Sequence, residues 1–138
     1  MTKCEELCIK GIILMLIFFS SSSIAAQLPD DIKIIQDKIT KCSGDYYGAQ
    51  ILNNLRNTGG QMYEDLSLCK QNTSNFIKEH QKNFLKEMGK KKLTALAKDF
   101  IIQSLSTLDA IGNEELFNNE LSKLKSTVSR IDLELSTE

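Results

Sequence analysis

The stretch Gln61–Met88, QMYEDLSLCKQNTSNFIKEHQKNFLKEM, decides the fold that we predict for this chain. Its apolar and small residues recur in steps of three and four, which puts them on one face of an α-helix. We therefore expect a central helix that is buried along this face and on which the other helices pack. The positions on the face are Met62, Leu66, Cys69, Thr73, Phe76, His80, Phe84 and Met88.

A second helix is predicted before this stretch, from about Asp30 to Arg56. Pro29 and the aspartates that follow it suit the first turn of a helix. Gly44 and Gly48 each weaken a helix by about 1 kcal/mol relative to alanine, so we expect this helix to be bent or broken between them. The sequence Asn57–Gly60 predicts the turn that leads into the central helix.

Two further helices are predicted after the central one. The apolar phase slips at Gly89, so we expect a turn at Met88–Lys91 and a helix from about Lys90 to Ile111, with one kinked continuous helix as the alternative. Asn113 is suited to cap the last helix, about Glu114–Leu135. That helix carries the most regular apolar stripe, which consists of Phe117, Leu121, Leu124, Val128, Ile131 and Leu135.

These segments predict an all-α fold, an antiparallel bundle of three to four helices, in residues 27–138 as a single domain. The composition agrees, because 41% hydrophobic and 25% charged residues are ordinary for a globular protein, and the chain has one proline. The formal net charge of −1 provides no general attraction to nucleic acid or to anionic membranes.

The N-terminal residues 1–26 have the pattern of a cleavable secretory signal peptide. Lysines flank a short polar start, the apolar run Gly11–Phe19 follows, and small residues come after it. The run is shorter than the ~20 residues that cross a bilayer, although an uncleaved anchor is the alternative. Ser23 and Ala25 favour cleavage after Ala25, and cleavage after Ala26 is the second choice. We expect an exported protein, either periplasmic or secreted.

Cleavage would remove Cys4 and Cys8 and leave Cys42 and Cys69 as the remaining pair. An even pair in an exported chain predicts a disulfide, whereas two buried free thiols are the alternative for a cytosolic chain. A straight helical hairpin would place the partner of Cys42 near position 75, about 9 Å along the helix from Cys69. We take this mismatch as support for a break at Gly44–Gly48.

Two tyrosines between the glycines, Tyr46 and Tyr47, are candidate partner-binding residues. Beside a disulfide cysteine they could form a rigid aromatic loop, and tyrosine offers a large contact area at low entropic cost. The alternative is that Tyr47 joins the core and Tyr46 lies on the surface as an incidental aromatic residue.

A basic stretch in the second half of the central helix and just beyond it is the candidate anion-binding surface. Such a stripe can bind phosphate, lipid headgroups or an acidic protein, but a solvated outer helix face has the same pattern. No aromatic residues or arginines are interleaved, so we expect no nucleic-acid binding. The lysines are Lys78, Lys82, Lys86, Lys90, Lys91 and Lys92.

The remaining motifs predict no metal, cofactor or catalytic site. His80 is the only histidine and has no second histidine or spare cysteine beside it, so we expect a half-buried core residue. Asn72-Thr73-Ser74 fits the N-glycosylation pattern, which matters only in a eukaryotic source. Phosphate-binding glycine loops and the common hydrolase motifs are not found in the sequence.

The sequence therefore predicts an exported, non-enzymatic binding or adaptor protein that acts through protein–protein contact. One alternative is peripheral attachment to an anionic surface or to lipid headgroups through Lys78–Lys92. A second is a periplasmic inhibitor or chaperone-like protein that engages its partner through Tyr46 and Tyr47 or a helix groove. A third is a small hydrolase whose carboxylates the fold would have to bring together. The sequence specifies neither the partner nor the oligomeric state.

Overall fold

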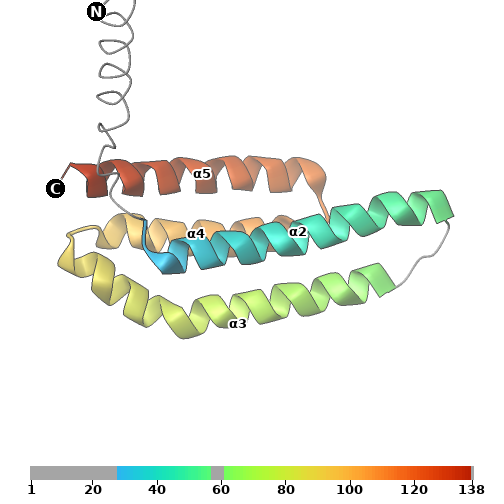
Figure 1. The fold of residues 1–138 in the computed structure, drawn as a ribbon, viewed down its shortest axis with the longest axis horizontal. Helices are drawn as coiled ribbons and strands as arrows, with labels where there is room; N and C mark the ends of the chain where they lie inside the picture. Colours follow the sequence, from blue (N-terminus) through green and yellow to red (C-terminus); the bar gives the residue numbers. More distant parts are fainter. Residues whose placement is uncertain (1–27, 57–60, 138) are drawn as a thin grey trace, which may run out of the picture.

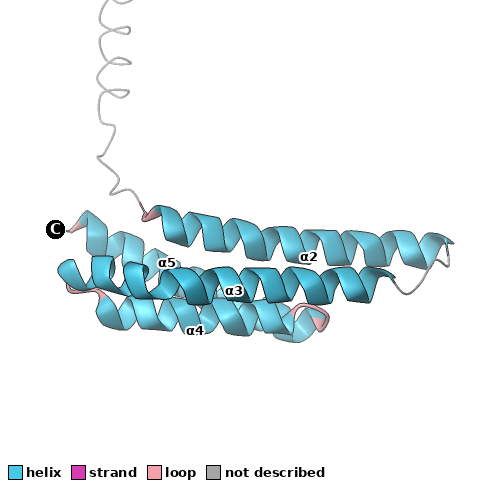
Figure 2. Ribbon diagram, turned by 90° about the horizontal axis from the view of Figure 1, so that it is seen from below, coloured by secondary structure: helices cyan, strands magenta, loops and turns pink. Residues whose placement is uncertain are grey.

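In a computed structural model, the residues described, 28–56 and 61–137, form four helices and no strand. The predicted all-α antiparallel bundle is confirmed, because successive helices run in opposite directions along one long axis in two perpendicular views (Figures 1 and 2). The signal peptide predicted in residues 1–26 and the turn predicted at 57–60 lie outside the described residues. The helices are α2 (Asp30–Arg56), α3 (Gln61–Lys90), α4 (Thr94–Ala110) and α5 (Glu114–Ser136).

The core is one cluster of buried apolar side chains to which all four helices contribute. Helix α3 packs on both α2 and α4, α4 also contacts α2, and α5 packs along α4. Phe84 of α3 and Phe100 of α4 are almost fully buried, with their ring centroids 5.6 Å apart. Burial of each such side chain contributes about 1.5–3 kcal/mol, so the apolar stripes hold the bundle together.

Helix α3 is the predicted central helix, with one shift in its buried face. Met62, Leu66, Thr73, Phe84 and Met88 are buried as expected. Between Thr73 and Phe84, Ile77 is the fully buried residue, whereas Phe76 and His80 lie half-buried at the edge of the face. The buried face of α3 therefore rotates slightly around the helix axis from one end of the helix to the other.

The predicted break at Gly44–Gly48 is wrong, because α2 is continuous from Asp30 to Arg56. A β-carbon built on either glycine would have no neighbouring atom within 4 Å, so both glycines lie on the outer face of the helix. The opposite face is anchored by Cys42 and Tyr46, which are 1% and 5% exposed. The burial of these side chains outweighs the helix-weakening effect of the glycines.

The predicted disulfide between Cys42 and Cys69 is present, with 5.8 Å between the Cα atoms. Helix α2 continues for 14 residues beyond Cys42, whereas α3 begins only 8 residues before Cys69. The last turns of α2 therefore project past the start of α3 by about 9 Å, as Figure 1 shows. Helix α2 thus extends further beyond the disulfide than α3 does, and this overhang, not a break, explains why Cys42 pairs with Cys69.

The predicted turn between α3 and α4 is present but lies at Lys91–Leu93 rather than at Met88–Lys91, because α3 continues through Gly89. Helix α3 ends at Lys90, and α4 begins at Thr94 rather than at the predicted Lys90. Lys92 adopts a left-handed conformation with φ 57°, and the Leu93 N–H donates to the Met88 carbonyl at 2.9 Å. The alternative of one kinked continuous helix is wrong, because the chain reverses here.

The last turn and helix follow the prediction closely. Gly112 has φ 111°, in the left-handed region that glycine tolerates, and ends the preceding segment. The Asn113 side chain accepts a hydrogen bond from the Leu116 N–H at 3.1 Å and so caps α5. This cap fixes where α5 starts relative to the end of α2.

Candidate functional site

The two tyrosines predicted as a loop lie instead within helix α2. Tyr46 is four residues after Cys42 on the buried face and is 5% exposed, whereas Tyr47 is half-buried beside it. The alternative that placed Tyr46 on the surface is therefore also wrong. Tyr46 presents little surface to a partner, and the partner-binding role that we predicted for Tyr47 stays a prediction.

Tyr46 and Tyr47 belong to an aromatic cluster at one end of the bundle, which we define as Tyr46, Tyr47, Tyr63 and Phe117. The ring of Tyr46 lies 5.1 Å from that of Tyr47 and 6.1 Å from that of Tyr63. The rings of Tyr47 and Phe117 are 5.7 Å apart. All three distances are in the range of favourable aromatic pairs. The cluster joins α2 to the first turns of α3 and α5.

Sequence reasoning identified only half of this cluster as candidate site residues. No local pattern marks Tyr63 as a candidate, and the apolar stripe of the last helix predicts Phe117 only as a core residue. Both residues lie within the first turn or so of a helix that follows a reversal of the chain. In an antiparallel bundle such positions meet the end of an earlier helix, which is the signal that could have identified them.

The environment of Tyr46 affects its acidity. Its burial, followed by the proximity of Tyr63 and Tyr47, raises the pKa of the Tyr46 phenol above its ordinary value of 10.0. Burial disfavours the phenolate because the charged form loses its hydration. Tyr46 is therefore held in its neutral form, as a structural side chain of the cluster.

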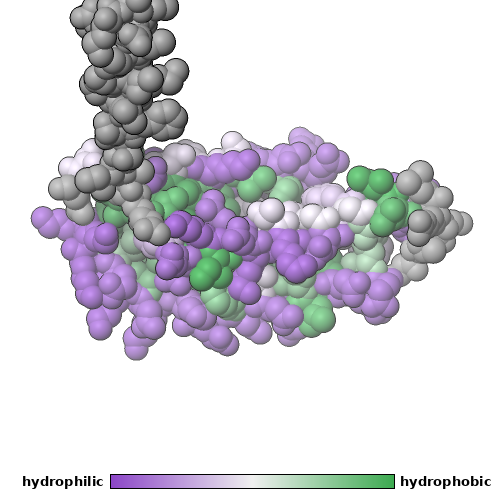
Figure 3. Space-filling model, in the orientation of Figure 1, coloured by the Kyte–Doolittle hydropathy of each residue, from purple (hydrophilic) through white to green (hydrophobic). Residues whose placement is uncertain are grey.

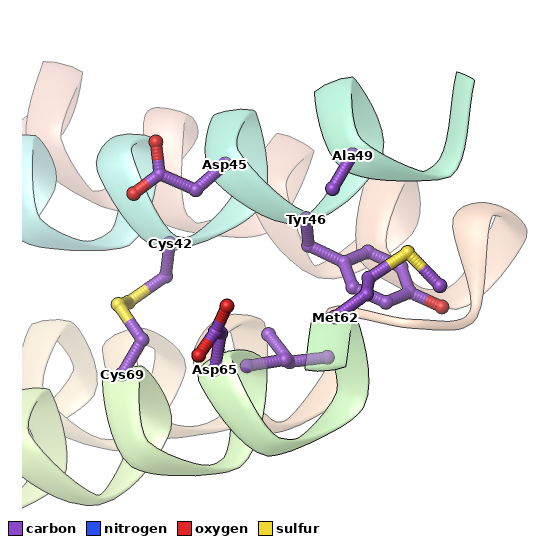
Figure 4. Close-up of a pocket in the computed structure, with 8 residues that line it drawn as sticks. Cys42, Asp45, Tyr46, Ala49, Met62, Asp65 and Cys69 are labelled. Carbon is purple, nitrogen blue, oxygen red and sulfur yellow. A yellow bond between two sulfur atoms is a disulfide. The ribbon is translucent and has the colours of Figure 1, made fainter. Parts of the chain in front are cut away.

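A groove of about 270 Å³ lies beside the disulfide, between α2 and α3, and we call it the disulfide groove. Figure 4 shows the carboxyl groups of Asp45 and Asp65, which come from α2 and α3, flanking the two cysteines. Asp45 accepts from Lys41 Nζ at 2.7 Å, and Asp65 accepts from Gln61 Nε2 at 3.1 Å. The complete lining is Cys42, Asp45, Tyr46, Ala49, Met62, Asp65, Leu66 and Cys69.

A second groove, of about 260 Å³, lies between α2 and the start of α5, and we call it the α2–α5 groove. Its apolar wall consists of Tyr47, Ile51 and Phe117, and Glu114 supplies a carboxylate at the rim. Tyr47 and Phe117 of the aromatic cluster therefore line this groove, while Tyr46 lines the disulfide groove. The two grooves thus lie on either side of the aromatic cluster.

Exposed apolar side chains accompany the grooves. Ile51 and Leu52, on the projecting turns of α2, are 63% and 52% exposed, and Tyr63 is 61% exposed. Figure 3 shows the corresponding hydrophobic surface at the C-terminal end of α2. Ile51 and Leu52 follow Gly44 and Asp45 by seven residues, so they lie on the same solvent-facing side of α2 as those exposed residues. We call Ile51, Leu52 and Tyr63 the apolar patch.

The predicted basic stretch lies toward the opposite end of the bundle. All six of its lysines are exposed, as expected for an outer helix face. Lys90 Nζ donates to Glu87 at 2.8 Å, and this hydrogen bond, together with the lysine's charge, lowers the pKa of Glu87. Anion binding by these lysines stays a prediction.

The contacts of His80 are those of a side chain that stabilises the fold. It is half-buried, its ring stacks on Phe76 with 4.0 Å between centroids, and its Nδ1 lies 2.9 Å from the Phe76 carbonyl oxygen. Since a carbonyl only accepts, Nδ1 carries the proton in this hydrogen bond. Among the described residues, no three histidine, cysteine or acidic side chains gather as a metal site would require.

The described helices include none with both the length and the apolarity needed to cross a membrane. Comparisons with protein families, with curated proteins and with solved structures found no match for this chain.

Proposed function

We propose that this chain is an exported, non-enzymatic binding or adaptor protein that acts through protein–protein contact at the end of the bundle formed by α2, α3 and α5. The N-terminal signal pattern and the single disulfide support export, since disulfides persist in oxidising compartments. The binding role rests on the exposed apolar patch and on the two grooves beside it.

The apolar patch is the observation that carries the proposal. Ile51 and Leu52 lie on neighbouring positions of α2, and both are more than half exposed. Exposed apolar groups next to concave, partly apolar surfaces are typical of protein-interaction sites. Tyr47 lines the α2–α5 groove together with Ile51, and its ring packs on that of Tyr46, which favours one shape for this wall. A rigid apolar surface loses little entropy when a partner covers it.

The test is capture of partners from the native extract by the oxidised protein and by the double variant Ile51→Asp/Leu52→Asp. We expect the variant to lose at least about tenfold in captured partner, because two charges in an apolar contact oppose its burial. Captured proteins are quantified by mass spectrometry, and circular dichroism verifies that both proteins keep the same helix content.

A matched control variant is Ile102→Asp/Leu133→Asp. These two side chains are 62% and 63% exposed, on α4 and α5 away from the apolar patch. The chemical change and the initial exposure are therefore nearly the same as in the test variant. Equal capture by both double variants would show that the patch at the end of α2 is not the binding surface, and the proposal would be wrong.

A second candidate function is attachment to an anionic surface through the lysines of Lys78–Lys92, whose side chains are all solvent-accessible. Binding to liposomes that contain anionic lipids should weaken as salt is added, because salt screens exposed charges. Lys78→Gln/Lys82→Gln/Lys86→Gln should weaken it further. Binding that does not depend on salt would contradict this function and leave the one proposed above.

A further inference from the structure

The charges of this chain are distributed unequally along the bundle. The segments 44–56, 61–70 and 109–120 meet at the end that carries the apolar patch, and they contain seven acidic residues against Arg56 and Lys70. Toward the opposite end, residues 78–99 contain seven lysines against three acidic residues, while the start of α2 and the end of α5 add Asp30, Asp31, Asp132 and Glu134 there. We call the first region the acidic end. Its acidic residues are Asp45, Glu64, Asp65, Asp109, Glu114, Glu115 and Glu120.

Most of these carboxylates are accessible to a partner. All except Glu120 are exposed. Asp45 is paired with Lys41 at 2.7 Å and Glu120 with Lys123 at 2.7 Å, and the other five carboxylates have no ion pair among the described residues. Lys70 Nζ donates to the backbone carbonyl of Asp109 at 2.6 Å. The field at this end is therefore negative, although the formal net charge of the whole chain is only −1.

In both grooves at the acidic end, carboxylates lie next to apolar side chains. The disulfide groove has Asp45 and Asp65 in its lining, next to the apolar side chains of Met62 and Leu66. The α2–α5 groove repeats this arrangement with Glu114 beside apolar groups. Each groove thus offers an apolar floor with a carboxylate at its side.

From this arrangement we propose that the acidic end binds a cationic amphipathic segment of a partner protein, an inference that rests on the binding function proposed above. The stems of lysine or arginine side chains lie on the apolar floors of the grooves, and their charged groups reach the carboxylates. The apolar residues of the same segment cover the apolar patch. This is the way in which amphipathic helices bind to apolar grooves.

A second copy of this chain fits the acidic end less well. Contact between the acidic end of one copy and the lysine-rich end of another would match the charges, but a head-to-tail contact of this kind generates a ring or an open filament and not a two-fold dimer, the commonest oligomer. The three side chains of the apolar patch also supply well under the roughly 800 Å² that each partner contributes to a stable interface. One segment of a partner is the better match in size.

The test uses a fluorescent helical peptide of about 18 residues, long enough to form a helix, with leucines on one face and lysines on the other. Its binding to the oxidised full chain is measured by fluorescence anisotropy. Two comparison peptides carry glutamate in place of lysine, or serine in place of leucine. We expect the leucine–lysine peptide to bind at least about tenfold more tightly than either comparison peptide. The glutamate peptide tests the contribution of charge, and the serine peptide tests the contribution of apolar contact.

Variants of the protein locate the binding. The isosteric change Asp65→Asn/Glu114→Gln removes one carboxylate beside each groove and should weaken binding about fivefold or more. The matched control Glu79→Gln/Asp99→Asn removes two exposed acidic groups toward the lysine-rich end and should leave binding unchanged. The unfolding temperature of each variant verifies that the fold is retained.

The outcomes separate this inference from the proposed function. Equal binding of the leucine–glutamate peptide, or unchanged binding by Asp65→Asn/Glu114→Gln, would overturn the inference. If Ile51→Asp/Leu52→Asp still abolished capture from the native extract, the proposed function would stand with a partner of different charge. Sedimentation that shows self-association through the acidic end would also overturn the inference, because a second copy would then occupy the surface.

Discussion

The hydroxyl oxygen of Tyr47 lies 3.4 Å from the backbone nitrogen of Gly112, so that a side chain of α2 accepts a hydrogen bond from the turn between α4 and α5. This contact connects two parts of the chain that are 65 residues apart. Together with the packing of the Tyr47 ring on Phe117, it holds the start of α5 against α2. The position of one wall of the α2–α5 groove therefore depends on Tyr47.

The first prediction concerns Tyr47. Replacing it by Phe should lower the free energy of unfolding by about 0.5–1 kcal/mol, the usual net value of one hydrogen bond. Tyr47→Ala should cost clearly more, because the ring contact with Phe117 is lost as well. Urea denaturation measures both changes. Tyr63→Phe, at an exposed tyrosine of the same cluster, is the control and should be nearly neutral. An equal effect of Tyr47→Phe and Tyr47→Ala would contradict the packing role.

The second prediction is a loss of stability at alkaline pH that depends on Tyr46. Its pKa is raised in the folded protein by burial and by Tyr63 and Tyr47. The unfolded chain therefore loses this proton first, near pH 10.0, the ordinary value. The stabilisation is fully present below that pH and is lost as the pH rises toward the folded-state pKa.

Urea denaturation between neutral pH and pH values above 10.0 should show this decline in the wild-type protein. The decline should be smaller in Tyr46→Phe, which keeps the ring but cannot ionise. The two proteins differ in no other ionisable group, so the comparison isolates Tyr46. Identical pH profiles of the two proteins would show that the phenol of Tyr46 titrates normally.

The third prediction concerns the disulfide. Cys42 and Cys69 are separated by 27 positions in the sequence. The loss of loop entropy in the unfolded chain predicts a stabilisation of about 3.5 kcal/mol. Cys42→Ser/Cys69→Ser should lose approximately this amount in urea denaturation under oxidising conditions. Reduction of the wild-type protein should produce a similar loss, whereas a double variant as stable as the wild type would contradict the prediction.

The fourth prediction concerns the turn between α3 and α4. Lys92 has a positive φ of 57°, a conformation that costs a residue with a β-carbon roughly 1 kcal/mol. Lys92→Gly should therefore raise the free energy of unfolding by up to about 1 kcal/mol. Lys91→Gly is the matched control, since Lys91 has no such conformation and glycine there should be destabilising. A destabilising Lys92→Gly would show that the lysine side chain has a stabilising contact.

The architecture followed from the sequence wherever apolar periodicity and a capping residue agreed. In α5 the stripe from Phe117 to Leu135 and the cap at Asn113 predicted the helix to within one residue of its observed end. In α2 the local signal of two glycines conflicted with the burial of Cys42 and Tyr46 on the other side of the helix. Long-range packing decided the outcome, and single-segment reasoning does not include it.

The candidate site was only partly predictable for the same reason. Tyr46 and Tyr47 were identified because they are adjacent aromatic residues, but their burial depends on how α2 meets α3 and α5. The acidic end draws its carboxylates from three separate segments, so no local run of charge indicates it. Its apolar patch combines Ile51 and Leu52 on the outer side of α2 with Tyr63 near the start of α3, and only the register of the two helices places these residues at the same end.

The position of the Cys42–Cys69 bond has a consequence for motion. Packed helices commonly change state by sliding past one another by a turn or less, at little energetic expense. A covalent link between the middle of α2 and the first half of α3 blocks that slide. The surface beyond the link therefore keeps one alignment of α2 and α3, and the partner that we propose would have to match this alignment.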